Sequence, residues 1–143
     1  MNEHILNSIT ELFSEKRNII LVPHSSPDAD ALGSCLALYH FFKQKNEVNI
    51  ISPNEHTEIL NFLPGSENIL NYESDKEKCE NILNKGDVIF TLDFNSLGRA
   101  RNLSSLISKS SAIIIMIDHH ENPDNYADIT ISNSKMSSTC EMI

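Results

Sequence analysis

The stretch at residues 24–34, which reads HSSPDADALGS, constrains this chain more than any other part of its sequence. It follows an apolar run at residues 19–22, which predicts a buried strand, and it leads into a helical pattern of apolar residues. One imidazole and two carboxylates, those of His24, Asp28 and Asp30, therefore lie where a strand passes into a helix. Ligands bind at this position in open α/β sheets, so the stretch is a candidate ligand site.

The two carboxylates of this stretch allow a second interpretation. Asp is among the preferred N-cap residues, so Asp28 or Asp30 can simply cap a helix that starts near Ala31. Residues two apart in an extended segment point the same way, so both carboxylates can also face one site. Pro27 favours extended geometry by restricting its own backbone and that of the residue before it. The capping interpretation leaves His24 unexplained.

Composition limits the classes of protein to which the chain can belong. Its 143 residues suit one domain, and the 40% that are hydrophobic are enough for a core. The formal net charge of −9 argues against broad binding to nucleic acid or to an anionic membrane, although divalent cations would allow an anionic substrate. There is no signal-peptide pattern and no apolar run of roughly 18 residues. Cys35, Cys79 and Cys140 form no CxxC pair, which indicates reduced thiols in a cytoplasmic protein.

The rest of the chain alternates apolar runs with helical patterns. The predicted strands lie at 18–22, 47–52, 88–93 and 112–117, with a short extended piece at 128–132. The predicted helices lie at 3–16, 31–45, 58–63, 75–84 and 95–108. Strands that alternate with helices predict an α/β domain, with a doubly wound, mostly parallel sheet flanked by helices.

Two further predicted strands end in side chains that bind metals. One strand ends in Asp93, and another is followed by Asp118, His119 and His120. The carboxyl ends of parallel strands meet at one edge of a sheet, so we expect these donors to lie beside those of the first stretch. Simpler interpretations stay open: Asp93 as a cap or turn residue, and the two histidines as a solvated turn or as core residues.

The combined donor set suits hard divalent cations. Carboxylates favour Mg²⁺ or Mn²⁺, and the imidazoles favour Mn²⁺ of the two. No cysteine is placed for a structural zinc site. Four acids and three histidines exceed the needs of one ion. Two ions about 3.5–4 Å apart are a common arrangement for hydrolysing phosphate esters. We therefore predict a two-metal site for Mn²⁺, with Mg²⁺ as the alternative.

In their order and spacing, these motifs resemble those of the DHH phosphoesterase family. The motifs are His24-x-x-Pro27-Asp28-x-Asp30-x-x-Gly33-Ser34, the strand-terminal Asp93, and Asp118-His119-His120. The segments at 93–97 and 136–141 also resemble the NrnA-like branch of oligoribonucleases and 3′-phosphoadenosine 5′-phosphate (pAp) phosphatases. The resemblance covers essentially the whole chain and implies that residues 1–143 are an N-terminal DHH catalytic domain.

The resemblance implies a ligand set for two Mn²⁺ ions. His24, Asp28 and Asp93 would hold the first ion. Asp30, Asp93 and His119 would hold the second, so that Asp93 bridges the two ions. A fourth family motif, a further aspartate that completes the second metal site, would lie beyond the end of this sequence.

The resemblance also implies how a substrate is held. His120 would contact the substrate phosphate or protonate the leaving oxygen, and Asp118 would orient the site. Gly33 and Ser34 lie at the start of a predicted helix, where backbone N–H groups bind anions, although close packing of helix on strand explains Gly33 equally well. Arg99, on the helix after the second donor-bearing strand, would reach a phosphate or form part of a solvated helix face.

The end of the sequence departs from the family pattern. Besides the fourth motif, the second, DHH-associated domain that binds the substrate would lie beyond Ile143. Residues 138–141 have the spacing of a capping box, which predicts a helix that begins just before the chain stops. We therefore expect an incomplete catalytic domain, and turnover by this polypeptide alone is left open.

The function that follows is a cytoplasmic, Mn²⁺-dependent phosphoesterase that hydrolyses short oligoribonucleotides and the 3′-phosphate of pAp. Its partners would be short RNA or nucleotide substrates, with a homodimer in the full-length protein and no membrane. The alternatives in the family are a cyclic dinucleotide phosphodiesterase, a RecJ-like single-strand exonuclease and a family II inorganic pyrophosphatase. The alternative from another class is a metal- or nucleotide-binding module that catalyses nothing.

Overall fold

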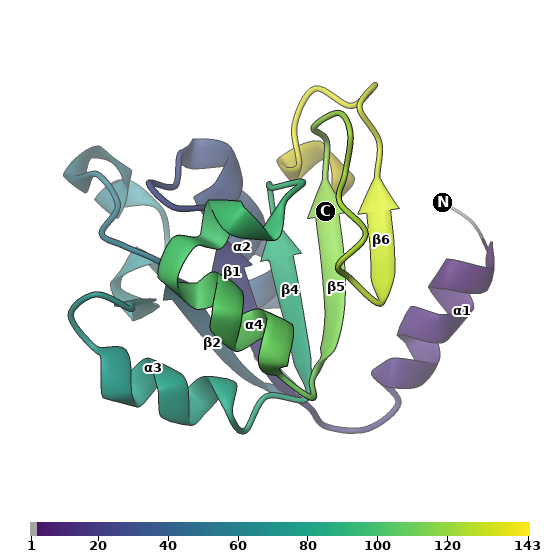
Figure 1. Ribbon diagram of the computed structural model, residues 1–143, viewed down its shortest axis with the longest axis horizontal. Coiled ribbons are helices and arrows are strands. Elements are labelled where there is room, and N and C mark those ends of the chain that lie inside the picture. The colour runs from purple at the N-terminus through teal and green to yellow at the C-terminus, as the bar shows by residue number, and fades with distance from the viewer. Residues whose placement is uncertain (1–2) are drawn as a thin grey trace.

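The computed structural model describes residues 3–143, with side chains at residue 7 and from residue 9 onward. Within these residues the strands are β1 (Asn18–Pro23), β2 (Glu47–Ser52), β3 (Ile69–Asn71), β4 (Val88–Leu92), β5 (Ile113–Asp118) and β6 (Ile129–Ser132). They form one sheet in the order β3-β2-β1-β4-β5-β6, and all neighbouring pairs are parallel (Figure 1). The chain runs outward from β1 to β3, returns to β4 and runs outward to β6. This is the doubly wound α/β arrangement, so the predicted fold class is confirmed.

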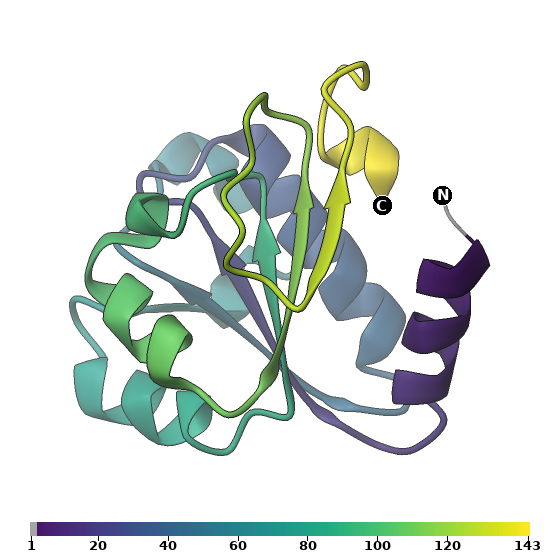
Figure 2. The ribbon, with the colours of Figure 1, turned by 45° about the vertical axis from the view of Figure 1, so that its right-hand side comes forward.

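The helices lie on both faces of this sheet. The α-helices are α1 (Glu3–Leu12), α2 (Ala29–Phe42), α3 (Lys76–Leu83) and α4 (Ser104–Lys109). The 3₁₀ helices are η1 (Glu58–Phe62), η2 (Ser66–Asn68), η3 (Leu97–Leu103) and η4 (Cys140–Met142). α2 covers one face of the sheet, whereas α3 and α4 cover the other (Figure 2).

Both faces of the sheet are buried, and β1 shows how. Ile19 and Leu21 pack toward α2, whereas Ile20 and Val22 pack toward α3 and α4, because successive side chains of a strand point to opposite faces. Each of these side chains is at most 1% exposed, and burial of such a side chain contributes about 1.5–3 kcal/mol. The apolar runs in the sequence are continuous because both faces of a covered parallel sheet need them.

Besides α1, which ends at Leu12 and not at residue 16, the structure differs from the sequence predictions in three places. The predicted helix at 31–45 begins two residues earlier, at Ala29, because Asp28 caps it. The predicted helix at 95–108 is instead η3 followed by α4, and η3 itself is interrupted at Arg101, where the backbone has φ 46° and ψ −117°. The sequence does not predict β3, whose three half-buried residues are too few to show a periodic pattern.

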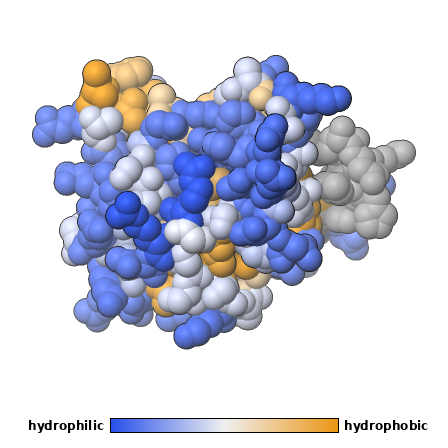
Figure 3. Space-filling view, turned by 45° about the horizontal axis from the view of Figure 1, so that its top comes forward, coloured by the Kyte–Doolittle hydropathy of each residue, from blue (hydrophilic) through white to orange (hydrophobic). Residues whose placement is uncertain are grey.

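The surface of the described residues is mostly hydrophilic. Figure 3 shows an apolar patch at its upper left, which lies over η1. Ile59 and Phe62 of η1 are 75% and 76% exposed. The three cysteines are free thiols, of which Cys35 and Cys79 are buried. Among residues 3–143, no helix has both the length and the apolar character that a membrane span requires.

Candidate metal centre

The donor side chains predicted from three strand ends lie together at one edge of the sheet. β1, β4 and β5 are adjacent and parallel, so the segments that follow them leave the sheet at the same edge, at the top of Figure 1. His24 follows β1, and Asp93 follows β4. Asp118 ends β5, directly before His119 and His120. The tertiary structure thus brings together residues that are up to 96 positions apart, from His24 to His120.

Asp93 lies at the centre of this group. It is 2% exposed, and its two carboxylate oxygens face different imidazoles. Oδ2 is 3.6 Å from Nε2 of His24, and Oδ1 is 3.6 Å from Nε2 of His119. The φ angle of Asp93 is 66°, in the left-handed region that costs a non-glycine residue about 1–3 kcal/mol. This strained turn after β4 holds the carboxylate between the two rings.

Hydrogen bonds on the far nitrogens orient both rings. Nδ1 of His24 is 2.8 Å from the carbonyl oxygen of Ser25, and Nδ1 of His119 is 3.3 Å from that of Met136. When Nδ1 donates to a carbonyl, the free lone pair of a neutral ring is on Nε2, which is the atom that faces Asp93. Metal-binding histidines are commonly held in this way.

Asp28 and Asp30 stand beside the same two rings. Oδ1 of Asp28 is 3.8 Å from Nε2 of His24, and Oδ2 of Asp30 is 3.7 Å from Nε2 of His119. These separations exceed a hydrogen bond. Two atoms that each lie about 2.1 Å from one ion are at most about 4.2 Å apart, so each pair fits around a shared cation of this kind. The donor chemistry and the spacing therefore fit Mg²⁺ or Mn²⁺.

The capping interpretation of the first stretch is also correct. Oδ1 of Asp28 accepts hydrogen bonds from the backbone N–H groups of Asp30 at 3.0 Å and Ala31 at 3.1 Å. The side chain of Asp28 is nevertheless 67% exposed and lies beside His24. One carboxylate thus both caps α2 and belongs to the donor group.

The second group of donors differs in one member from the predicted set. The structure contains two groups of three residues whose ligand atoms all lie within 4.8 Å of one another. The first group is His24, Asp28 and Asp93, and the second is Asp93, His119 and His120, so Asp93 belongs to both. In the predicted set, Asp30 takes the place of His120. Oδ1 of Asp118 is 2.7 Å from Nδ1 of His120 and occupies that nitrogen, which leaves Asp30 as the better-placed third donor.

His120 is held by a carboxylate rather than by a carbonyl. Asp118 is fully buried, and its Oδ2 accepts a hydrogen bond from the backbone N–H of His120 at 3.0 Å. With the bond to Nδ1, this fixes the ring in one orientation. Nε2 of His120 then lies 3.4 Å from Nη1 of Arg99. Arg99 therefore lies at the same edge of the sheet as the candidate metal donors, and phosphate binding by this residue stays a prediction.

The surroundings of His24 and Asp30 favour their charged forms. Burial alone would lower the pKa of His24, but the carboxylate of Asp93 and a backbone carbonyl hold it above its ordinary value of 6.5. Burial alone would raise the pKa of Asp30, but hydrogen bonds from the N–H groups of Cys140 and Thr139 hold it below its ordinary value of 3.8. A cation that binds at this site therefore competes with a proton for His24.

Gly33 and Ser34, which the sequence predicts to face a substrate, pack against Cys140. Ser34 is fully buried, and its hydroxyl lies 3.4 Å from Sγ of Cys140. A Cβ on Gly33 would lie 2.8 Å from the same sulfur, closer than van der Waals contact allows. The glycine thus serves the close approach of η4 to α2, and anion binding by these two residues stays a prediction.

Sequence reasoning gives no role in the site to Asn54 or to Thr139, although Thr139 lies in the segment at 136–141 that resembles the NrnA-like branch. Oδ1 of Asn54 accepts hydrogen bonds from the hydroxyl of Ser25 at 2.9 Å and from the N–H of Ser26 at 2.7 Å. The buried hydroxyl of Thr139 donates to Asp93 at 2.8 Å. Asn54 carries no local signal, and the pattern around Thr139, which indicates the start of a helix, does not show a contact with Asp93.

Comparisons with known proteins bear on the family and the fold of this chain. The profile of the DHH family's N-terminal domain matches residues 18–143. An exopolyphosphatase-related protein from Bacteroides fragilis has 40% sequence identity and a TM-score of 0.95, over 99% of this chain and 42% of that one. Exonuclease RecJ bound to manganese has 17% identity and a TM-score of 0.54, over 95% of this chain and 34% of that one, which is a likeness of fold. This chain thus spans less than half the length of the Bacteroides protein.

Proposed function

The chain belongs to the DHH family, and we propose that it is the catalytic domain of a phosphoesterase that works with two divalent metal ions, preferably Mn²⁺. The observation that carries this proposal is the placement of Asp93. Each of its carboxylate oxygens lies 3.6 Å from the Nε2 atom of a different histidine. A carboxylate in this position can bridge two cations, and paired divalent cations are a common means of hydrolysing phosphate esters.

We assign the ligands from the donor groups around Asp93. His24, Asp28 and Asp93 would hold one ion, and Asp30, Asp93 and His119 the other. When bound, the ions supply positive charge to the phosphate oxygens and lower the pKa of a water molecule that attacks phosphorus. RecJ, which shares the fold, binds manganese, and this supports Mn²⁺ as the metal.

The residues beside the metal donors would hold the substrate. Arg99 can bind a phosphate through several N–H donors. His120 presents Nε2 on the same side, 3.4 Å from the guanidinium. Because Asp118 is hydrogen-bonded to Nδ1, Nε2 is the ring nitrogen that remains to pass a proton to the leaving oxygen.

We propose short oligoribonucleotides and pAp as the substrates. The segments at 93–97 and 136–141 support this choice, because they resemble the NrnA-like branch. With a net charge of −9, the chain would attract such anions through bound cations and Arg99 and not through its overall surface. The Bacteroides relative is named for its relation to exopolyphosphatases, so polyphosphate is a second candidate substrate.

This chain spans 42% of the length of the Bacteroides chain, so the substrate site and the assembly of the whole protein are proposals as well. We propose that a second, DHH-associated domain completes the substrate site, and that the protein is a cytoplasmic homodimer. Cyclic dinucleotides, pyrophosphate and single-stranded DNA are the remaining candidate substrates. The non-enzymatic alternative is a module that binds metal and nucleotide without turnover.

The deciding experiment measures phosphate release from pAp in the presence of Mn²⁺, and in parallel from short RNA, polyphosphate, pyrophosphate and a cyclic dinucleotide. It uses this chain together with any sequence that follows it in its reading frame. We expect release from pAp and shortening of the RNA. Asp93→Asn should lower both rates by more than about 100-fold, since loss of even an outer partner of a metal ligand typically costs 10–100-fold.

Glu77→Gln is the matched control because it removes one negative charge from an exposed residue of α3. It should leave the rates unchanged. Equal rates for Asp93→Asn and the wild type would refute the metal centre. Turnover of polyphosphate without turnover of pAp or RNA would move the function to the second candidate, and Mn²⁺ binding without any turnover would favour the binding module.

A further inference from the structure

A short segment late in the chain, residues 137–141, holds both oxygens of the Asp30 carboxylate. The backbone N–H of Thr139 donates to Oδ2 of Asp30 at 2.8 Å, and the N–H of Cys140 donates to Oδ1 at 2.7 Å. These partners lie 109 and 110 residues away along the chain. Hydrogen bonds to both oxygens prevent rotation of the carboxylate, so its orientation is fixed before any ion binds.

The same segment reaches the central carboxylate. The hydroxyl of Thr139 donates to Oδ1 of Asp93 at 2.8 Å, and this oxygen also faces Nε2 of His119 at 3.6 Å. Thr139 is fully buried and Asp93 nearly so, which excludes water from the bond between them. A hydrogen bond to an ionised acceptor is roughly twice as strong as one between neutral groups. One residue thus contacts both carboxylates of the second donor group.

Contacts within the segment keep it in place. Oε2 of Glu141 accepts hydrogen bonds from the N–H and the hydroxyl of Ser137, at 2.9 Å and 2.7 Å. The N–H of Glu141 donates to the hydroxyl oxygen of Ser138 at 3.1 Å. Sγ of Cys140 lies 3.3 Å from the carbonyl oxygen of Asp30, at the start of α2. The segment is therefore closed on itself and joined to the helix that carries the ligand.

We propose that Thr139 is a positioning residue of the metal centre: its hydroxyl and its N–H fix the carboxylates of Asp93 and Asp30 in the orientation that the second cation requires. The inference rests on the proposed two-metal function. Each oxygen that accepts one of these hydrogen bonds keeps a second lone pair for an ion. Partners of this kind, one step out from the ligands, tune metal sites strongly.

The test measures Mn²⁺ binding by isothermal titration calorimetry, with electron paramagnetic resonance of the bound ions as a second readout. Thr139→Val removes the hydroxyl and nearly preserves the shape of the side chain. We expect the affinity for the second ion to fall about 10–100-fold. The spectrum of a spin-coupled Mn²⁺ pair should give way to that of isolated ions. Thr139→Ser keeps the hydroxyl and should restore both the affinity and the coupled spectrum.

Thr91→Val is the matched control. Thr91 is also fully buried, but its hydroxyl is hydrogen-bonded to the hydroxyl of Tyr126, at 2.8 Å, and not to a candidate ligand. This variant should melt at a lower temperature and bind Mn²⁺ as the wild type does. Should Thr139→Val not fold, Thr139→Ala carries the same test with a smaller side chain.

The outcomes separate this inference from the proposed function. A wild-type protein that binds no Mn²⁺ would refute the metal centre itself. If the wild type binds two ions and a folded Thr139→Val or Thr139→Ala variant binds both as tightly, the positioning role is overturned and the metal centre stands. A serine variant as weak as the valine variant would also overturn it, because the hydroxyl would then not be the cause.

Discussion

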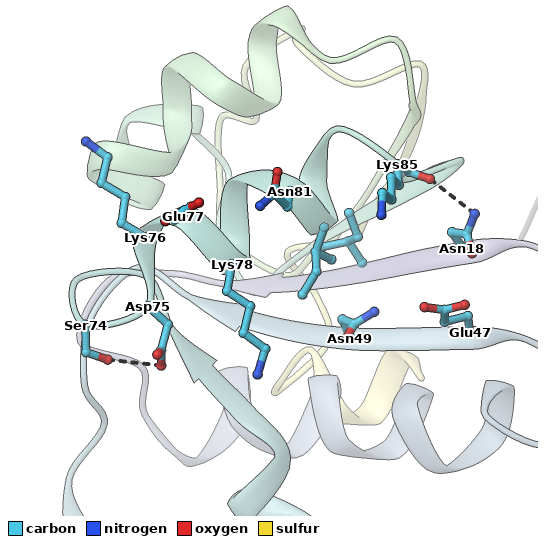
Figure 4. Close-up of a pocket in the computed structure, with 12 residues that line it drawn as sticks. Asn18, Glu47, Asn49, Ser74, Asp75, Lys76, Glu77, Lys78, Asn81 and Lys85 are labelled. Atoms are coloured by element: carbon cyan, nitrogen blue, oxygen red, sulfur yellow. Dashed lines mark hydrogen bonds between the residues drawn. The ribbon is translucent and has the colours of Figure 1, made fainter.

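Two polar regions of the molecule differ in how firmly their charged side chains are held. A hollow of about 870 Å³ lies between α3 and the starts of β1 and β2 (Figure 4). Its lysines, Lys76, Lys78 and Lys85, are all exposed. Figure 4 marks two hydrogen bonds among the residues drawn, one within the turn before α3 and one from Asn18 to a backbone carbonyl.

The candidate metal centre is built in the opposite way. Asp93 and Asp118 are buried. Nδ1 of each of the three histidines lies within hydrogen-bond distance of an oxygen, which is a backbone carbonyl for His24 and His119 and the carboxylate of Asp118 for His120. This difference favours the donor group over the hollow as the candidate functional region, because functional side chains need a fixed orientation more than a large volume. Substitutions in the two regions test this difference.

Among the substitutions that compare the two regions, Asp118→Asn should have the largest effect. Asp118 holds the ring of His120 but is not in either predicted ligand set, so turnover of pAp should fall about 10–100-fold while the Mn²⁺ affinity stays unchanged. Steady-state kinetics and calorimetry on the same preparation measure both quantities. A variant with full activity would show that the orientation of His120 does not matter.

Substitution of two glycines, one near each region, should have effects of intermediate size. A Cβ on Gly33 would meet Sγ of Cys140 at 2.8 Å, and a Cβ on Gly86 would meet Cδ1 of Ile20, beside the hollow, at 2.6 Å. Gly33→Ala should displace the segment that holds Asp30 and weaken Mn²⁺ binding several-fold. Gly86→Ala should lower the free energy of unfolding by about 1–3 kcal/mol through overpacking and leave Mn²⁺ binding unchanged.

Urea unfolding and Mn²⁺ titration of both glycine variants give the comparison directly. If Gly86→Ala weakened Mn²⁺ binding as much as Gly33→Ala did, the effect would reflect general destabilisation. Close packing beside the candidate metal centre would then matter no more for Mn²⁺ binding than close packing beside the hollow.

The smallest effect is expected in the hollow itself. Lys78 is exposed and forms no ion pair in the structure as described from residue 3 to residue 143. Lys78→Ala should change the free energy of unfolding by less than about 0.5 kcal/mol and leave the turnover of pAp unchanged. A loss of activity comparable to that of Asp118→Asn would show that the hollow takes part in the function, and the contrast would be broken.

Much of the fold could be predicted from sequence because buried parallel strands need unbroken apolar runs. β1, β4 and β5 follow this rule, and all of them lie in the middle of the sheet. β3 could not be predicted, because this edge strand has only three half-buried residues and therefore no continuous apolar run. The break at Arg101 could not be predicted either, because the surrounding residues have helical spacing and only the packed backbone shows the turn.

The candidate site divides along the same line. The residue types at three strand ends are visible in the sequence, so His24, Asp93 and His119 can be selected from it. The support from Asn54 and Thr139 cannot, because Asn54 lies in no motif, the segment around Thr139 does not show what it contacts, and both residues reach the site only through the folded chain.

The fold class, the central strands and the candidate donors can be derived from the sequence alone, because apolar periodicity and residue chemistry are local properties. Only the tertiary structure decided which oxygen of Asp93 faces which imidazole, and that Thr139 holds Asp30 across 109 residues of chain. The physical reason is that hydrogen bonds between distant segments depend on strand order, register and a strained turn, and none of these leaves a periodic trace in the sequence.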